Sequence, residues 1–201
     1  FDKVIFAGSL GKFFRKNVND FSSKFYLEPL KENVEHVSSL LNQYKGIKIG
    51  ISWKSKREFY GEGKSIKLND FESLLTIPNS HLINLQYGNI DEDLKQISNN
   101  DKFNLLTLKN IDLMNDFETI SALLCSLDLF ITVSNSTAHL AGALNVPSIL
   151  IKPKSFAIFH YWNQSENKTP WYDSIELIDQ SESVDIMFNS IKEIIFSKFN
   201  L

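Results

Sequence analysis

The sequence predicts an α/β protein with a Rossmann-like parallel sheet and helices on both faces. Short apolar stretches alternate along the chain with longer amphipathic stretches, which is the pattern of a sheet covered on both sides. Each such unit takes about 20 to 30 residues, the size of a βα repeat. Apolar residues dominate several of the short stretches, such as residues 127–133 (LDLFITV), as expected of buried strands.

The expected elements follow one another in this alternating order. Strands are expected at residues 4–7, 47–53, 81–86, 103–106, 127–133, 146–151 and 175–178. Helices are expected at residues 30–44, 71–75, 91–97, 117–126, 137–144 and 184–196. In the first helix, Val34, Val37, Leu41 and Tyr44 recur at three- and four-residue spacings and form one apolar face. The helix at 71–75 has capping candidates in Asn69 and Asp70, and acidic residues begin the helix at 91–97.

Composition limits the possible functions. The chain has 201 residues, 43% of them hydrophobic and 22% charged, which excludes a disordered or collagen-like protein. The net charge of −3 gives no electrostatic case for binding nucleic acid. A single cysteine, Cys125, cannot form an internal disulfide, so we expect a reducing compartment and a cytoplasmic location. No apolar run approaches the roughly 20 residues of a membrane-spanning helix.

Residues 1–28 are predicted to be a connector that enters a single Rossmann-like domain at residues 29–201. The chain opens with Phe1 and no signal-peptide pattern follows, so we expect it to be part of a longer protein. Parallel sheets of this kind bind ligands at the carboxyl ends of their strands. We therefore expect the functional residues in the loops that follow residues 53, 86, 133 and 151.

The segment 134–142 (SNSTAHLAG) is the first candidate site. A buried strand leads into Ser134, Asn135, Ser136 and Thr137, and a helix of small residues begins at once. Hydroxyl side chains can cap this helix, and the free amides of its first turn attract a phosphate group. An ordinary capped helix without a ligand explains the same residues equally well.

The loop after Trp53 is the second candidate site because it is long and basic. Gly61 and Gly63 allow backbone bends, and Ser52 together with Lys64 could complete a phosphate site. The loop contains neither a Walker sequence nor a complete dinucleotide-binding glycine pattern. A solvated surface loop is the alternative interpretation. The basic residues of this loop are Lys54, Lys56, Arg57, Lys64 and Lys67.

Aromatic residues are dense after residue 151, and we assign most of them to a lid or to the core. They are Phe156, Phe159, His160, Tyr161, Trp162, Trp171 and Tyr172. His139 and His160 are the histidines near candidate sites, and a lone histidine is more often a scaffold residue than a catalyst. The sequence has no spacing typical of a metal site, so no metal or other cofactor is expected.

Several blocks together resemble one family. The run ITVSNSTAHLAGALNVP at residues 131–147 resembles a signature of GT-B glycosyltransferases, namely the lipopolysaccharide heptosyltransferases and the bacterial tetratricopeptide-repeat enzymes related to O-GlcNAc transferase and SPINDLY. Further blocks lie in the family's order and extend the resemblance over nearly the whole chain. They are KIGISWKS (48–55), GKSIKL (63–68), NLQYG (84–88), SLDLFITVS (126–134) and TPWYDSIELIDQ (169–180).

This resemblance implies the C-terminal, donor-binding half of a metal-independent glycosyltransferase. Its partners would be a nucleotide-sugar donor, an unknown acceptor and a missing N-terminal half that contains the acceptor site, with or without tetratricopeptide repeats. The implied donor-phosphate residues are Ser52, Lys54, Lys64, Asn135, Ser136 and Thr137, and the implied base or ribose residues are Gln86, Tyr87 and Asp116. Catalytic roles fall to Lys64, which would stabilise the departing diphosphate, and to His139, which would orient the substrate.

The chain departs from the family pattern at the sugar end of the expected pocket. Ser134 and Asn135 stand where many relatives have Asp-Thr, and Tyr161 and Trp162 replace a Trp-x-Trp sequence. The donor sugar therefore stays open. Two alternatives also stay open: a non-catalytic nucleotide-binding or scaffold domain that keeps the fold, and a sugar-nucleotide epimerase of the same fold.

Overall fold

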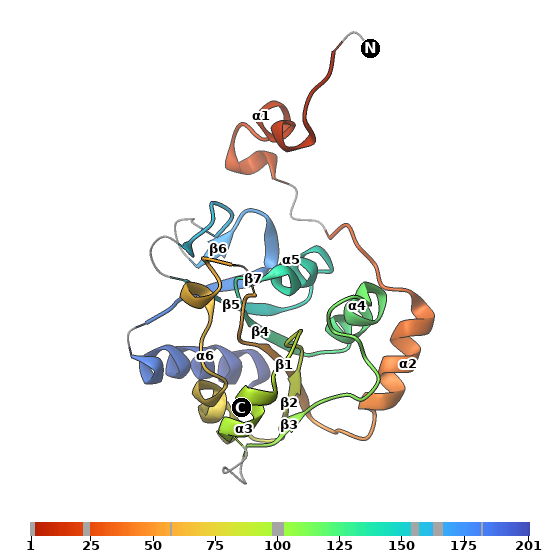
Figure 1. Cartoon of the computed structure of the whole chain (residues 1–201), viewed down its shortest axis with the longest axis vertical. Helices are drawn as coiled ribbons and strands as arrows, with labels where there is room; N and C mark the ends of the chain where they lie inside the picture. The colour runs from red at the N-terminus through yellow and green to blue at the C-terminus, as the bar shows by residue number, and fades with distance from the viewer. Residues whose placement is uncertain are drawn as a thin grey trace.

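A seven-stranded sheet with the order β3-β2-β1-β4-β5-β7-β6 forms the centre of the computed structural model of the chain (Figure 1). Neighbouring strands from β3 to β7 are parallel, and β6 runs antiparallel to β7. The strands are β1 (Ile47–Ser52), β2 (Ser80–Asn84), β3 (Leu105–Leu106), β4 (Leu129–Val133), β5 (Ser148–Lys152), β6 (Lys168–Thr169) and β7 (Tyr172–Asp179). The structure describes residues 3–21, 25–56, 58–97, 103–153, 157–162, 167–181 and 183–201.

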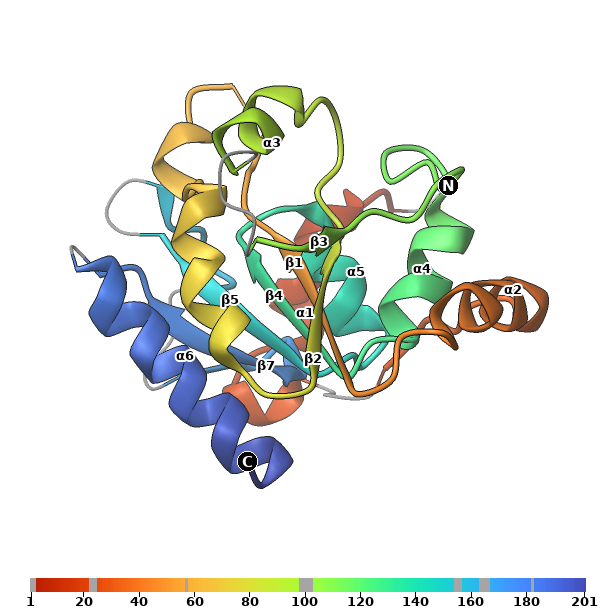
Figure 2. The same ribbon diagram turned by 90° about the horizontal axis from the view of Figure 1, so that it is seen from below.

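Helices cover both faces of this sheet (Figures 1 and 2). The α-helices are α1 (Gly11–Phe14), α2 (Lys31–Leu41), α3 (Asp91–Ile97), α4 (Phe117–Cys125), α5 (Ser136–Ala143) and α6 (Val184–Phe199). The 3-10 helices are η1 (Ala7–Ser9), η2 (Val18–Asp20), η3 (Glu62–Lys64) and η4 (Leu68–Thr76). Buried side chains of α3, α6 and η4 pack on one face of the sheet, and those of α2, α4 and α5 pack on the other.

The two-residue period of the strands divides the core between these layers. In β4, Leu129, Ile131 and Val133 pack toward η4 and α6, whereas Phe130 packs toward α2 and α4. All of these β4 side chains are at most 2% exposed. Successive side chains point to opposite faces of a strand, so a strand that is buried throughout must lie inside a three-layer arrangement.

The strand order reverses direction between β1 and β4. Their loops turn to opposite faces of the sheet, which leaves a crevice at the carboxyl ends of these strands where ligands bind in open parallel sheets. The Rossmann-like fold predicted from the sequence is therefore confirmed. A ligand site at this edge of the sheet stays a prediction.

Three local predictions need correction. The strand expected at residues 4–7 is wrong: Val4 and Phe6 are 81% and 85% exposed, and this segment pairs with no strand of the described part of the chain. The helix expected at 71–75 is the longer 3-10 helix η4. The short antiparallel strand β6 was not predicted, since two residues carry no periodic pattern.

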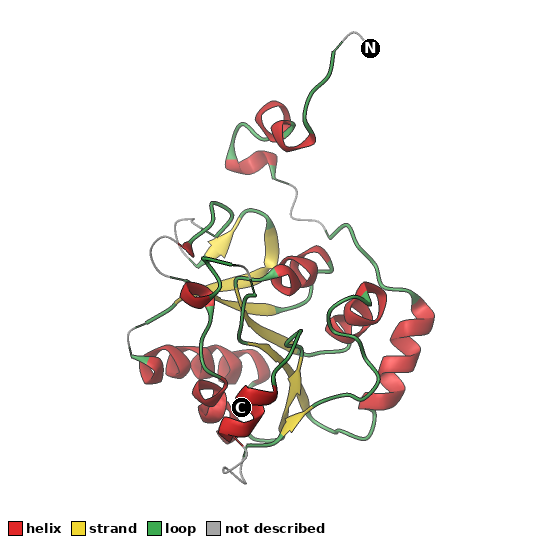
Figure 3. Cartoon of the chain, viewed as in Figure 1, coloured by secondary structure: helices red, strands yellow, loops and turns green. Residues whose placement is uncertain are grey.

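The described residues before α2, 3–21 and 25–30, form an arm that consists mainly of loops and short helical turns (Figure 3). The described part of the arm contacts the domain at Trp171 and at the end of α5. The Arg15 guanidinium lies 4.5 Å from the ring centroid of Trp171, and the backbone N–H groups of Tyr26 and Leu27 both donate to the Ala143 carbonyl. The proposed domain boundary at residue 28 stays a prediction.

Gly142→Ala should destabilise the protein, although alanine normally favours a helix by about 1 kcal/mol over glycine. A Cβ atom at position 142 would lie 2.3 Å from Cγ of the buried Tyr172 ring, so the ring or α5 has to shift. We expect a net loss of about 1–3 kcal/mol in the free energy of unfolding, measured by urea denaturation. Gly11→Ala is the control, because no atom lies within 4 Å of a Cβ there. Equal stability of the two variants would contradict this packing.

Candidate functional site

A pocket of about 310 Å³ lies at the carboxyl ends of β1, β2 and β4. The loops after these strands and the segment after β5 all contribute to its wall. The lining residues are Ser55, Lys64, Tyr87, Ser134, Asn135, Ser136, His139, Phe159 and Tyr161. The structure thus brings both candidate loops of the sequence analysis into one pocket.

The N-terminus of α5 forms one side of this pocket. Asn135 is the N-cap, and its side-chain oxygen accepts a hydrogen bond from the Ala138 backbone N–H at 3.0 Å. Ser136 follows as the first residue of the helix and is exposed toward the pocket. Backbone N–H groups in the first turn have no partner within the helix and carry its positive partial charge. This side of the pocket therefore favours an anion.

Lys64 supplies a cation to the same pocket. Its side chain leaves the 3-10 helix η3 and is only 4% exposed, and its Nζ lies 3.7 Å from the centroid of the Phe159 ring. Such a position above an aromatic face stabilises an ammonium group. None of the described residues that line the pocket is acidic. An anionic ligand would thus meet positive charge at a wall whose described residues add no carboxylate.

A buried network of hydrogen bonds supports the residues that line the pocket. The Gln86 side-chain oxygen accepts hydrogen bonds from the Ser52 hydroxyl at 3.1 Å and from the backbone N–H groups of Trp53 at 2.9 Å and Lys54 at 2.7 Å. The Asn135 amide donates to the Ser52 hydroxyl at 2.9 Å. One network therefore joins the ends of β1, β2 and β4, and fixes the position of the α5 N-cap.

His139 lies in an aromatic cluster at the pocket wall. Its ring stacks on Trp162 at a centroid distance of 4.8 Å and meets the edge of Tyr161 at 4.5 Å, and its Nδ1 lies 3.1 Å from the Tyr172 hydroxyl. Burial, with a smaller contribution from the charge of Lys64, lowers the pKa of His139 to about 4. The imidazole is therefore neutral at pH 7 and supplies one donor and one acceptor nitrogen.

Five of the predicted site residues line the pocket: Lys64, Tyr87, Asn135, Ser136 and His139. Ser52, Gln86 and Thr137 are buried and lie outside its lining. The Ser52 hydroxyl is already bonded to Gln86 and Asn135, so a direct ligand contact would break this network. For Ser52 and Gln86 the geometry favours a supporting role.

The two remaining predicted residues have other partners. The Lys54 ammonium forms an ion pair with Asp93 of α3 at 2.6 Å, away from the pocket lining. Asp116 is exposed and caps α4, where its side chain accepts from the Thr119 backbone N–H at 3.0 Å. Hydrogen bonds from Thr119, chiefly from its side chain and to a smaller extent from its backbone, lower the pKa of Asp116. Each would have to leave its present partner to contact a ligand in this pocket.

Four lining residues were absent from the predicted site: Ser55, Ser134, Phe159 and Tyr161. Ser134 lies within the segment already singled out, and its hydroxyl accepts a hydrogen bond from the Trp162 indole at 3.0 Å. Phe159 and Tyr161 belong to the aromatic stretch that was assigned to a lid or core. Their density in a loop at the carboxyl edge of the sheet was the available signal. Arg57 and Phe156, also considered above, lie outside the described residues.

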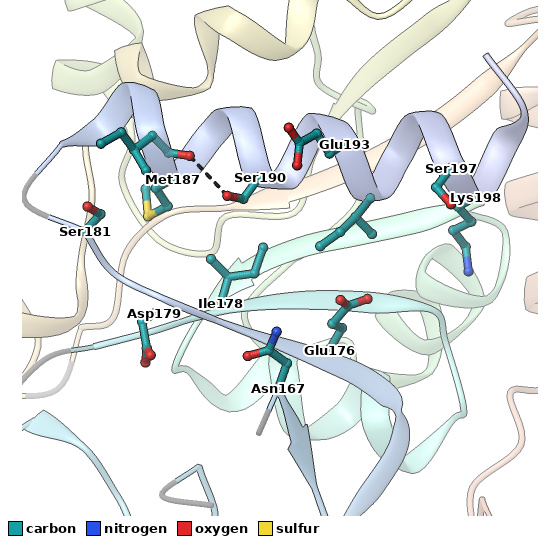
Figure 4. A pocket seen from close by; sticks show the side chains of 12 residues that line it. Asn167, Glu176, Ile178, Asp179, Ser181, Met187, Ser190, Glu193, Ser197 and Lys198 are labelled. Carbon is teal, nitrogen blue, oxygen red and sulfur yellow. Dashed lines mark hydrogen bonds between the residues drawn. The ribbon is translucent and has the colours of Figure 1, made fainter. Parts of the chain in front are cut away.

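A larger open groove of about 780 Å³ lies between β7 and α6 (Figure 4). Figure 4 shows Glu176 and Asp179 on β7 and Glu193 on α6 around it. This groove contains none of the predicted site residues, and its carboxylates would repel an anion. Nowhere in the described ranges do three or more His, Cys, Asp or Glu side chains gather as in a metal site. Nor does any described helix have the length and apolarity to cross a membrane.

Acidification should destabilise the wild-type protein more than the His139→Gln variant. The unfolded chain takes up a proton on this histidine near pH 6.5, whereas the folded protein does so only near pH 4. Stability associated with the buried neutral ring is therefore present above pH 6.5 and is lost as the pH falls toward 4.

We expect the wild type to lose about 1–3 kcal/mol more than His139→Gln between pH 7 and pH 4.5, in urea unfolding experiments at each pH. His36→Gln, a change at an exposed histidine of α2, is the control and should follow the wild type. Identical losses in the wild type and in His139→Gln would refute the buried, neutral state of His139.

No protein-family model matches the sequence. A curated relative, Protein FlbA of Caulobacter vibrioides, is 28% identical over 153 residues, which cover 75% of this chain and 25% of that protein. The chain thus spans about a quarter of the length of this relative.

Solved structures show the same fold. The E. coli ADP-heptose LPS heptosyltransferase II matches 92% of this chain with 57% of its own length, at a TM-score of 0.64 and 12% identity. The family 9 glycosyl transferase of Veillonella parvula matches 87% with 48% of its length, at 0.61 and 14%. E. coli heptosyltransferase WaaC with ADP matches 82% with 48% of its length, at 0.55 and 14%. The chain therefore has the fold of a part of the heptosyltransferases and other GT-B glycosyltransferases, as the sequence motifs predicted.

Proposed function

We propose that this chain is the donor-binding portion of a metal-independent glycosyltransferase and binds the diphosphate of a nucleotide sugar. One observation carries the proposal: Lys64 and the N-terminus of α5 line the same pocket, and no described lining residue is acidic. Two of the similar structures are E. coli heptosyltransferase WaaC with ADP and with ADP-2-deoxy-2-fluoro heptose, which supports a nucleotide-sugar ligand.

Each lining residue receives a role from its position. The first-turn amides of α5, with the Ser136 hydroxyl, would donate hydrogen bonds to the diphosphate oxygens. Lys64 would stabilise the negative charge that builds on the departing nucleoside diphosphate, without help from a metal. Tyr87 offers an aromatic face to the base. Ser52 and Gln86 would hold these groups in place through the buried network.

The acceptor and the base that deprotonates it would come from outside the pocket. His139 is neutral and hydrogen-bonded to Tyr172, and the described lining offers no carboxylate for proton transfer. A separate N-terminal half, with or without tetratricopeptide repeats, is our proposed source. Exposed apolar side chains on the arm, including Val4, Phe6 and Phe14, support contact with a further protein domain there. A cytoplasmic location belongs to the same proposal.

The lack of a general base in the described lining also favours a second candidate, a non-catalytic nucleotide-binding domain. The two candidates predict the same binding but different chemistry. A longer protein that contains this chain and its N-terminal half would transfer or hydrolyse a nucleotide sugar under the first proposal. Tight binding without any turnover over a panel of UDP-, ADP- and GDP-sugars would favour the second.

Lys64→Ala should weaken the binding of a nucleoside diphosphate by about 10- to 100-fold, because a charge-assisted contact to a phosphate oxygen is lost. Isothermal titration of the 201-residue chain with ADP, UDP and GDP first identifies the preferred base. The variant is then titrated with that nucleotide.

Lys67→Ala is the matched control, since Lys67 lies in the same loop but is exposed and does not line the pocket. Its dissociation constant should stay within about twofold of the wild type. The absence of binding by any of the three nucleotides at millimolar concentration would refute the proposed function. Equal affinity of the wild type and Lys64→Ala would remove Lys64 from the site.

A further inference from the structure

Lys64 reaches the pocket on a long loop that leaves the sheet after β1 and returns to it before η4. This lysine loop comprises residues 53–66, of which the structure describes all but residue 57. Its two ends lie side by side, because the Ile66 backbone N–H donates to the Trp53 carbonyl at 3.0 Å. Compact surface loops whose ends meet are packed by their own side chains and frequently contain functional residues.

The Ser65 hydroxyl makes two hydrogen bonds inside the lysine loop. It accepts from the Ser55 backbone N–H at 3.1 Å and donates its single proton to the Gly61 carbonyl at 2.7 Å. The Gly61 carbonyl also accepts from the Lys64 backbone N–H at 3.1 Å. One carbonyl group therefore joins the Ser65 side chain to the turn from which the lysine side chain leaves.

That turn has few hydrogen bonds of its own. It is the 3-10 helix η3, which is three residues long, and hydrogen bonds in 3-10 helices have poorer geometry than those in α-helices. Gly61 and Lys64 are buried, and a buried carbonyl or N–H group that loses its partner is costly. The Ser65 hydroxyl thus adds a constraint that the short helix lacks.

The part of the loop that Ser65 closes contacts the Phe159 ring at two places. The Lys64 Nζ lies 3.7 Å from the centroid of this ring, and the Tyr60 ring lies 5.9 Å from it. Ser65 itself is not among the described residues that line the pocket. An effect of Ser65 on a ligand in the pocket would therefore pass through Lys64.

We propose that Ser65 is a positioning residue, whose hydroxyl fixes the lysine loop so that the Lys64 ammonium is held in the pocket before a ligand arrives. A side chain that is already in place loses less conformational freedom on binding, which strengthens its contact with the ligand. The diphosphate as ligand rests on the function proposed above. The position of Lys64 does not, and it can be measured without any ligand.

The first test measures the position of Lys64 by NMR of protein with ¹³C-labelled lysine. Protons above the face of an aromatic ring are shifted upfield, so the ε-CH₂ signal of Lys64 should lie upfield of the signals of exposed lysines. Lys64→Arg assigns this signal, and Phe159→Leu shows its position without the ring. We expect Ser65→Ala to move the signal toward its position in Phe159→Leu, whereas Ser65→Thr, which keeps a hydroxyl, should stay close to the wild type.

A second pair of variants isolates the hydroxyl from the size of the side chain. Ser65→Val and Ser65→Thr have nearly the same shape, but only threonine can hydrogen-bond, so this pair tests the proposal even if Ser65→Ala fails to fold. Ser80→Ala is the matched control. The Ser80 hydroxyl also donates to a backbone carbonyl, that of Ile77 at 2.9 Å, but it lies at the start of β2, away from the pocket. This control should leave the Lys64 signal unchanged.

The second test combines Ser65→Ala with Lys64→Ala and measures the dissociation constant of the preferred nucleoside diphosphate by titration. Ser65→Ala should raise this constant about 3- to 10-fold when Lys64 is present, but by less than about twofold in the Lys64→Ala background. A general loss of structure would weaken binding equally in both backgrounds. The cycle therefore separates positioning of Lys64 from a merely structural effect.

The outcomes distinguish this proposal from the proposed function. A Lys64 signal without an upfield shift in the wild type, or a shifted signal that neither Ser65→Ala nor Ser65→Val changes, overturns the role of Ser65 whatever the protein binds. A signal that responds while the wild type binds no nucleotide refutes the proposed function and supports the positioning role. Equal effects of Ser65→Ala on affinity in the two backgrounds, including no effect in either, overturn its action on the ligand through Lys64.

Discussion

The hydrogen bonds among Asn135, Ser52 and Gln86 are the constraint on which the candidate site depends. These three side chains are at most 6% exposed. They lie at or just after the ends of β1, β2 and β4 and are hydrogen-bonded to one another. Buried amide and hydroxyl groups are costly without partners, so each of them fixes the position of the next. Because Asn135 also caps α5, the network determines where the positive end of that helix lies relative to the loop that contains Lys64.

This arrangement explains how a weakly acidic protein places positive charge beside a pocket. The net charge is −3, and the large groove beside α6 bears carboxylates. The described lining of the small pocket, in contrast, includes a lysine and a helix N-terminus but no acidic residue. The fold therefore places acidic side chains at the groove and the lysine at the pocket. The lysine is almost fully buried, and at low exposure a charge acts more strongly on a ligand because water screens it less. The same charge contributes to the low pKa of His139.

Most of the fold follows from patterns that a single sequence contains, whereas the detailed site does not. The buried strands are local features that the spacing of apolar residues predicts. The cap of α5 is different: the sequence favoured the hydroxyls of Ser136 and Thr137, whereas Asn135 is the N-cap. Which group each lysine side chain contacts depends on the tertiary structure. Lys54 and Lys64 stand in the same basic segment, but α3 presents Asp93 to one and the loop after β5 presents Phe159 to the other. Which of two similar lysines faces a ligand depends on segments about 40 and 95 residues away in the chain, beyond the reach of local patterns.

The arm is a second case in which a local sequence pattern does not determine the structure. Its apolar residues 4–7 have the composition of a strand, but the sheet ends in the short strands β3 and β6 and gives them no partner. Instead, backbone N–H groups of the arm donate to the last residue of α5, and Arg15 packs on Trp171, just before β7. Since α5 presents its C-terminal turn to the arm and its N-terminus to the pocket, a displacement of the arm acts on the same rigid helix that an anion would contact. Under the proposed function, a domain that moved the arm would therefore also act on α5, the helix whose N-terminus lines the pocket.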